Sequence, residues 1–123
     1  MLFRSASIMV SINACDVAGT GVSARDRALT IRRLTDPNST PEDFVQPGHV
    51  TPLMAQAGGV LKRAGHTEAA VDLARMAHRQ PVALMAAILD DSGNVADTPC
   101  LLEFARQHEF KIATIHEIGR AHV

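Results

Sequence analysis

The chain has 123 residues, of which 46% are hydrophobic and 20% charged, as expected for one globular domain rather than a disordered tail. Its formal net charge of -1 and its lack of Trp and Tyr argue against a nucleic-acid-binding protein. No apolar run approaches the roughly 20 residues of a membrane helix, and two lone cysteines, Cys15 and Cys100, fit a reduced, cytoplasmic protein.

The first half of the chain predicts a strand, a helix and a long loop. Residues 8–14 alternate partly and include β-branched side chains, which favours a strand. Ser23 is expected to cap a helix that runs to about Leu34 and buries Ala24, Ala28 and Ile31. Residues 35–52 contain four of the six prolines, so we expect a long loop there, with one turn around residues 42–44.

The second half predicts strands that alternate with helices. A short extended piece at 59–62 precedes a helix over 67–78 that its first residue, Thr67, would cap. The buried face of this helix would carry Ala70, Leu73, Ala74 and Ala77. The apolar run 82–89 suits a buried strand, and a helix over 99–108 and a strand over 111–115 follow. This order predicts a mixed α/β layered domain.

One segment has the features of an anion site. Arg63-Ala64-Gly65-His66-Thr67 joins a turn of small residues to a helix start, where unpaired N–H groups and the helix dipole favour a phosphate. Arg63 would add a bidentate cation, and His66 a metal ligand or an acid–base group. A capped helix with a solvated arginine is the alternative interpretation.

A second histidine follows a Pro-Gly turn. His49 in Pro47-Gly48-His49-Val50 could be held rigidly enough for proton transfer, although a surface-loop histidine explains the same pattern. Asp90-Asp91 before Ser-Gly is more typical of a solvated turn than of a carboxylate pair.

Several of these segments, in order and at matching spacing, resemble the 3,4-dihydroxy-2-butanone-4-phosphate synthase family of riboflavin biosynthesis. The resemblance runs from about Ile8 to Ile115. The matching motifs are Thr20-Gly21-Val22-Ser23-Ala24 with Asp26-Arg27, Pro47-Gly48-His49-Val50 with Pro52-Leu53, Gly58-Gly59-Val60-Leu61, and Arg63-Ala64-Gly65-His66-Thr67-Glu68-Ala69 with Asp72-Leu73.

The resemblance implies an α/β (α+β) sandwich that forms a homodimer. It also implies a lyase that converts ribulose 5-phosphate to 3,4-dihydroxy-2-butanone 4-phosphate and formate with two Mg2+ ions, or with Mn2+. By the same resemblance, His49 would be catalytic and His66 a metal ligand. Substrate would be bound by Arg63, Ala64, Gly65, His66, Thr67 and Thr20.

Other features depart from the family. An acidic segment that opens the family domain has no counterpart before Ile8, and the family's essential glutamate falls on Ala87. We therefore expect residues 1–117 to be a partial synthase domain with an incomplete metal site and little or no activity of its own. A non-catalytic paralogue that binds sugar phosphates or dimerises is the alternative. Residues 118–123 match the translation of a common sequencing adapter, and we interpret them as such.

Overall fold

The computed structural model describes residues 7–122, and the chain divides into two compact units, residues 1–55 and 56–123. Residues 1–6 and 123, which include the ends of the expected domain 1–117 and of the tail 118–123, lie outside the described part. No helix within the described residues is long and apolar enough to cross a membrane.

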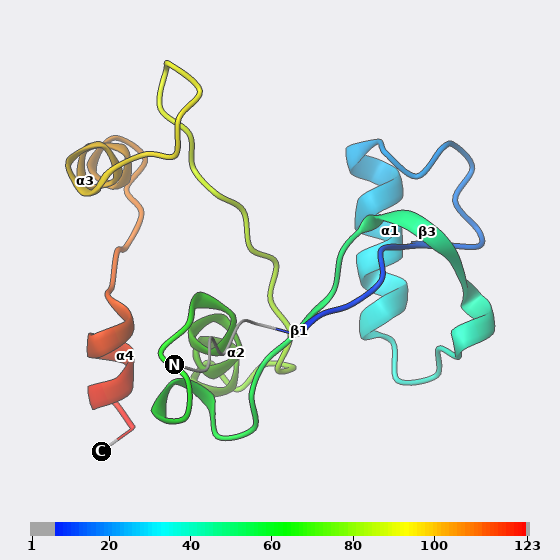
Figure 1. The fold of residues 1–123 in the computed structure, drawn as a ribbon, viewed down its shortest axis with the longest axis horizontal. Coiled ribbons are helices and arrows are strands. Elements are labelled where there is room, and N and C mark those ends of the chain that lie inside the picture. Colours follow the sequence, from blue (N-terminus) through cyan, green and yellow to red (C-terminus); the bar gives the residue numbers. More distant parts are fainter. Residues whose placement is uncertain (1–6, 123) are drawn as a thin grey trace. The chain divides into compact units, whose positions relative to one another are not determined.

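Two small antiparallel sheets and one long helix make up the first unit (Figure 1). Its elements in chain order are β1 (Ser7–Ile8), β2 (Ile12–Ala14), α1 (Ala24–Thr35), the 3-10 helix η1 (Pro41–Asp43), β3 (Phe44–Val50) and β4 (Leu53–Met54). Strand β1 pairs with β4, and β2 pairs with β3. Helix α1 packs against β2 and β3, so the predicted mixture of helix and sheet is confirmed here.

Helix α1 begins where the sequence predicts, but it buries a different face. The Ser23 hydroxyl accepts a hydrogen bond from the Asp26 backbone N–H at 3.1 Å, as an N-cap should. The side chains that α1 buries are Asp26 and Thr30, whereas Ala28 and Ile31 are half-buried. The Thr30 hydroxyl accepts from Ala14 N–H and donates to the Asp26 carbonyl, both at 3.0 Å, so a polar side chain joins the helix to β2.

The predicted loop over 35–52 is wrong in its second half, where β3 forms. Proline lacks a ladder donor, yet β3 accommodates Pro47 after a cis peptide bond and beside a register shift in the pairing with β2. Gly48 makes the close approach to β2 possible, because a Cβ there would lie 1.9 Å from the carbonyl carbon of Ile12. The strand predicted over 8–14 is interrupted between β1 and β2.

The second unit contains four helices, and three of them surround a small core. They are the 3-10 helix η2 (Gly59–Leu61) and the α-helices α2 (His66–Met76), α3 (Thr98–Gln107) and α4 (Ile115–Arg120). Helix α4 packs on α2 and η2, and the core cluster consists of Val60, Ala69 and Ile118 with Ile115 against it. Helix α3 confirms the prediction over 99–108, with Asp97 as its N-cap.

The start of α2 differs from its prediction. Residues 59–61 form a helical turn rather than an extended piece, because Gly58 and Gly59 take positive φ angles of 94° and 60°. The N-cap of α2 is Gly65 and not Thr67, which is buried inside the first turn. The buried face carries Thr67, Glu68, Ala69 and Asp72. Leu73, expected inside, is 48% exposed.

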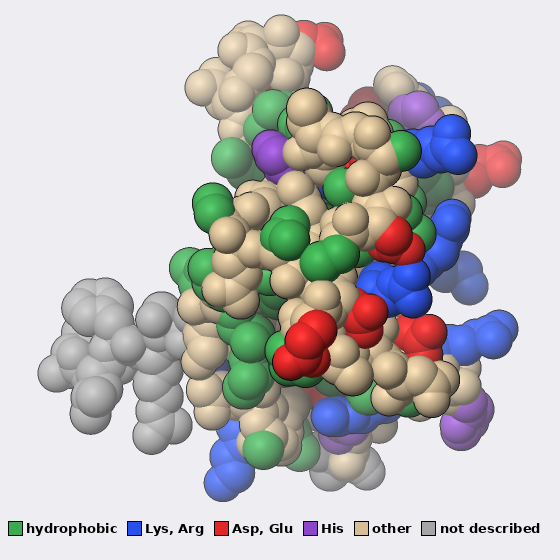
Figure 2. All heavy atoms as spheres, turned by 90° about the vertical axis from the view of Figure 1, so that its right-hand side faces the viewer, with side chains coloured by type: hydrophobic (Ala, Val, Ile, Leu, Met, Phe, Trp, Pro, Cys, Tyr) green, Lys and Arg blue, Asp and Glu red, His purple; other side chains and the backbone are tan. Residues whose placement is uncertain are grey.

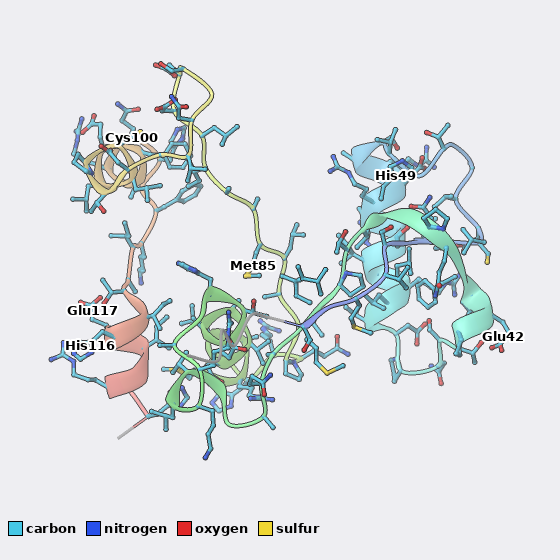
Figure 3. All side chains as sticks on the ribbon, viewed as in Figure 1. Glu42, His49, Met85, Cys100, His116 and Glu117 are labelled. Atoms are coloured by element: carbon cyan, nitrogen blue, oxygen red, sulfur yellow. The ribbon has the colours of Figure 1, made fainter. Side chains whose placement is uncertain are left out.

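Neither strand predicted in the second unit forms among the described residues. Segment 82–89 is extended but makes only an isolated bridge between Leu89 and Val95, and Leu84 is 77% exposed (Met85 in Figure 3 marks the segment). No described strand pairs with it, and an apolar run alone supplies no backbone partner. Residues after 111 lead instead into α4, whose N-cap Thr114 accepts from the Glu117 N–H.

Candidate functional site

In the first unit, buried Asn13 on β2 joins two of the motif segments. Its Oδ1 accepts from the His49 backbone N–H at 2.9 Å, and its Nδ2 donates to the Thr20 carbonyl at 3.4 Å. The imidazole Nδ1 of His49 lies 3.3 Å from Asn13 Nδ2 and 3.4 Å from Oδ1. His49 itself is exposed on β3 (Figure 3), so Asn13 orients a ring that solvent or a ligand can reach.

The turn that carries Thr20 is folded closely onto the same asparagine. Gly21 has a φ of 86°, and a Cβ there would lie 2.1 Å from Asn13 Nδ2. The Gly21 N–H donates to Asp26 Oδ2 at 3.2 Å, which ties this turn to the first turn of α1. The structure therefore brings Thr20 and His49 together around Asn13, with Thr20 contributing its carbonyl to that contact.

In the second unit, a buried ion pair spans the turn before α2. Glu68 is 0% exposed; its Oε2 accepts from Arg63 Nη1 at 2.6 Å, and its Oε1 accepts from the Gln56 N–H at 2.9 Å. Burial would by itself raise the pKa of Glu68, but the hydrogen bonds from Gln56 and Arg63 outweigh it and lower the pKa below its ordinary value. Glu68 is thus held as a carboxylate.

A second buried carboxylate, Asp72, braces the preceding turn. Its Oδ2 accepts from the Val60 N–H at 2.8 Å, and a Cβ on Gly59 would lie 2.2 Å from the same oxygen. Arg75 Nη1 lies 3.4 Å from Oδ1, and His122 Nε2 lies 3.4 Å from Oδ2. The segment before α2 is therefore fixed from within the helix by two carboxylates one turn apart.

Five of the residues expected to bind substrate lie at the start of α2, namely Arg63, Ala64, Gly65, His66 and Thr67, whereas Thr20 lies in the first unit. His66 is exposed at the first position of the helix and Ala64 is exposed beside it, whereas Gly65 is half-buried and Thr67 is buried. Backbone N–H groups at a helix start favour an anion, and phosphate binding here stays a prediction. By contrast, Asp90 Oδ1 accepts from the N–H groups of Ser92 and Asn94 at 2.9 Å, so Asp90 caps a local turn as predicted.

The described residues do not fit a metal centre. No group of three or more His, Cys, Asp or Glu side chains among them could hold an ion. A hard divalent cation is bound by several oxygen ligands, and His66 alone does not supply them. Glu68 and Asp72, the carboxylates nearest in sequence, are already engaged by N–H donors.

Charges of both signs are exposed on the face drawn in Figure 2, where acidic side chains gather beside Lys and Arg. Arg33 on α1 pairs with Asp16, and the hydrogen bond from Arg33 lowers the pKa of Asp16. This face therefore lacks the uniform positive charge that a nucleic-acid backbone attracts.

The sequence profile of the family 3,4-dihydroxy-2-butanone 4-phosphate synthase matches residues 4–121. The chain belongs to this family. A synthase of that name from Neisseria meningitidis serogroup A is 53% identical over 109 residues, which are 89% of this chain and 30% of the relative. The riboflavin biosynthesis protein RibBA of Aquifex aeolicus is also 53% identical, over 89% of this chain and 27% of its own length.

Solved synthase structures share the fold. The enzyme of Candida albicans aligns with a TM-score of 0.91 and 37% identity, over 96% of this chain and 61% of its own. A synthase in complex with two magnesium ions aligns with a TM-score of 0.81 and 36% identity, over 98% and 61%. The chain thus spans about 30% of the two sequence relatives and about 60% of these structures. The synthase family fold inferred from the motifs is confirmed, and the described residues combine helices with two small antiparallel sheets.

Three side chains that organise the site were given no role by the sequence: Asn13, and Glu68 and Asp72, which appeared only as members of a matching motif. Asn13 gave no signal, because a single amide in a short strand has no characteristic spacing. Glu68 and Asp72 are four residues apart, so they share a helix face, and that face is buried rather than solvated. The clue available in the sequence was two acidic residues four positions apart, directly after a glycine-containing segment.

Proposed function

We propose that the whole protein is a lyase of riboflavin biosynthesis that converts ribulose 5-phosphate to 3,4-dihydroxy-2-butanone 4-phosphate and formate. The family match over residues 4–121 carries this proposal, because it includes both the His49 segment and the turn before α2. As in the family, we propose a cytoplasmic homodimer that uses Mg2+ or Mn2+.

Within that reaction, this chain would supply substrate binding and one proton-transfer group. Arg63 and the N–H groups at the start of α2 would hold the phosphate, with Ala64, Gly65 and Thr67 shaping the turn. His49, oriented by Asn13, would exchange a proton with the bound sugar, and Thr20 would line the substrate on the side of Asn13. His66 would be one ligand of a metal whose other ligands come from outside the described residues.

We further propose that this chain, acting alone, has no synthase activity. Two observations support this proposal. The described residues contain no group of three or more His, Cys, Asp or Glu side chains that could hold a metal ion, and Ala87 offers no proton at the position where the resemblance places the family's glutamate. The test is a coupled formate assay on the purified chain with ribulose 5-phosphate and Mg2+. We expect no formate above background, and Mg2+-dependent release would contradict this proposal.

The alternative is a non-catalytic paralogue, and Ala87 is the observation that favours it. Returning a glutamate there, as Ala87→Glu in the longest natural form of the protein, separates the two. Formate release that appears only in the variant would support a recently inactivated enzyme. A variant that binds the sugar phosphate but stays inactive would support the non-catalytic function.

A further inference from the structure

Glu68 is the largest fully buried side chain among the described residues. Its side chain is 0% exposed; Oε1 accepts a hydrogen bond from the Gln56 N–H at 2.9 Å, and Oε2 accepts one from Arg63 Nη1 at 2.6 Å. Removing a carboxylate from water is costly unless it is paired. A glutamine could accept from Gln56 equally well, so the negative charge is needed for the contact with Arg63.

The turn between these two residues is closed around their ion pair. A Cβ on Gly65 would lie 2.1 Å from Arg63 Nη1 and 2.5 Å from Glu68 Oε2, and the Gly65 N–H donates to the Arg63 carbonyl at 2.8 Å. The guanidinium therefore lies directly against the backbone of the turn. Its side chain is 22% exposed, so one edge of the group is near the surface.

We propose that Glu68 is a positioning residue, which holds the Arg63 guanidinium over the turn before α2 in the orientation that receives a phosphate ester. The inference rests on the proposed function of this turn. A free arginine loses much side-chain entropy when it is fixed on a ligand. Glu68 fixes Arg63 during folding, so binding no longer bears that cost.

Electrostatic repulsion alone predicts the opposite change in phosphate affinity, so the two explanations can be told apart. A carboxylate close to a phosphate repels it, so a Glu68 without a positioning function would weaken binding. Glu68→Gln would then bind phosphate more tightly. If Glu68 positions Arg63, Glu68→Gln should bind phosphate about tenfold more weakly. This is the order of effect expected when the ligand itself must order one side chain.

The experiment is calorimetric titration of the 123-residue chain with ribulose 5-phosphate, and with inorganic phosphate as a second probe. The proteins are wild type, Glu68→Gln, Arg63→Gln and the double variant. Glu103→Gln is the matched control, since it breaks a surface pair with Arg106 of the same 2.6 Å length away from this turn. We expect weaker binding by Glu68→Gln, no further loss in the double variant relative to Arg63→Gln, and no effect of the control.

Two results would overturn the inference: unchanged or tighter binding by Glu68→Gln, or an equal loss when Arg63 is already replaced. A second measurement needs no variant: nitrogen relaxation of the Arg63 Nε–H in the wild type reports how mobile the guanidinium is. A guanidinium as mobile as an exposed arginine overturns the inference even if the sugar phosphate binds. If the guanidinium is rigid but the chain binds neither probe, the inference is also overturned. In that case the proposed phosphate-binding function of the turn is wrong.

Discussion

Replacing Thr30 by valine tests how α1 is attached to β2. Thr30 is fully buried, and its hydroxyl accepts from Ala14 N–H and donates to the Asp26 carbonyl, both at 3.0 Å. Valine has nearly the same shape, so it leaves no cavity, but it leaves the buried Ala14 N–H without its acceptor. An unsatisfied buried donor costs about 1–3 kcal/mol, so we expect a loss near 2 kcal/mol in the free energy of unfolding.

Thr30→Ser is the matched comparison, because it keeps the hydroxyl and removes a methyl group. Burial of one such group is worth about 0.8 kcal/mol, so the serine variant should be more stable than the valine variant. Urea unfolding followed by circular dichroism measures both, and amide exchange at Ala14 reports the lost bond directly. If the valine variant is as stable as wild type, or more stable than the serine variant, the hydrogen bond does not hold α1 on β2.

Three further predictions concern the first unit. Asn13→Ala removes the acceptor of the His49 N–H, so we expect a loss of about 1 kcal/mol and faster exchange of that amide by NMR; unchanged exchange would contradict the positioning of His49. Gly48→Ala drives a methyl group into the β2 backbone and should cost about 1–3 kcal/mol, seen as a lower urea midpoint; an unaltered midpoint would disprove the close approach. Because its bond to Arg33 lowers the pKa of Asp16, that carboxylate stabilises the fold above its ordinary pKa, and the contribution disappears as pH falls through the lowered value. Asp16→Asn should therefore be less stable than wild type near neutral pH and equal to it in strong acid; a difference that persists in acid would refute the pairing.

Local signals predicted the elements that local contacts determine. The Ser23 cap and the helical spacing after it predicted α1, and Pro99 near the start of its segment predicted α3. Strand β3 escaped because a proline-rich segment predicts a loop, whereas its pairing with β2 depends on a partner far away in the sequence. The strand predicted over 82–89 is wrong because an apolar segment becomes a strand only beside another strand, and this segment makes only an isolated bridge.

Motifs in the sequence predicted which segments form the candidate site, but not the side-chain contacts that hold them. His49 and the segment from Arg63 to Thr67 were recognised by their resemblance to a family, which the profile match confirms. Their roles in binding and catalysis remain predictions. The contacts that hold them come from Asn13, 36 residues from His49, and from Glu68, five residues from Arg63, and neither side-chain contact leaves a periodic pattern in the sequence.

The interpretation of residues 118–123 as translated adapter also remains a prediction. Ile118 packs in the core of the second unit, and the family profile extends to residue 121. An independent read of the gene beyond the codon of Glu117 decides this point. The same residues in that read would refute the adapter origin, and a different continuation would support it.

The central claim is that the turn before α2 binds the phosphate of ribulose 5-phosphate. The most direct measurement is an NMR titration of the nitrogen-labelled 123-residue chain with that sugar phosphate. We predict saturable shifts of the amides of residues 63–67 and no shifts in the turn at residues 90–94. Shifts confined to other segments, or none at millimolar sugar phosphate, would contradict the claim.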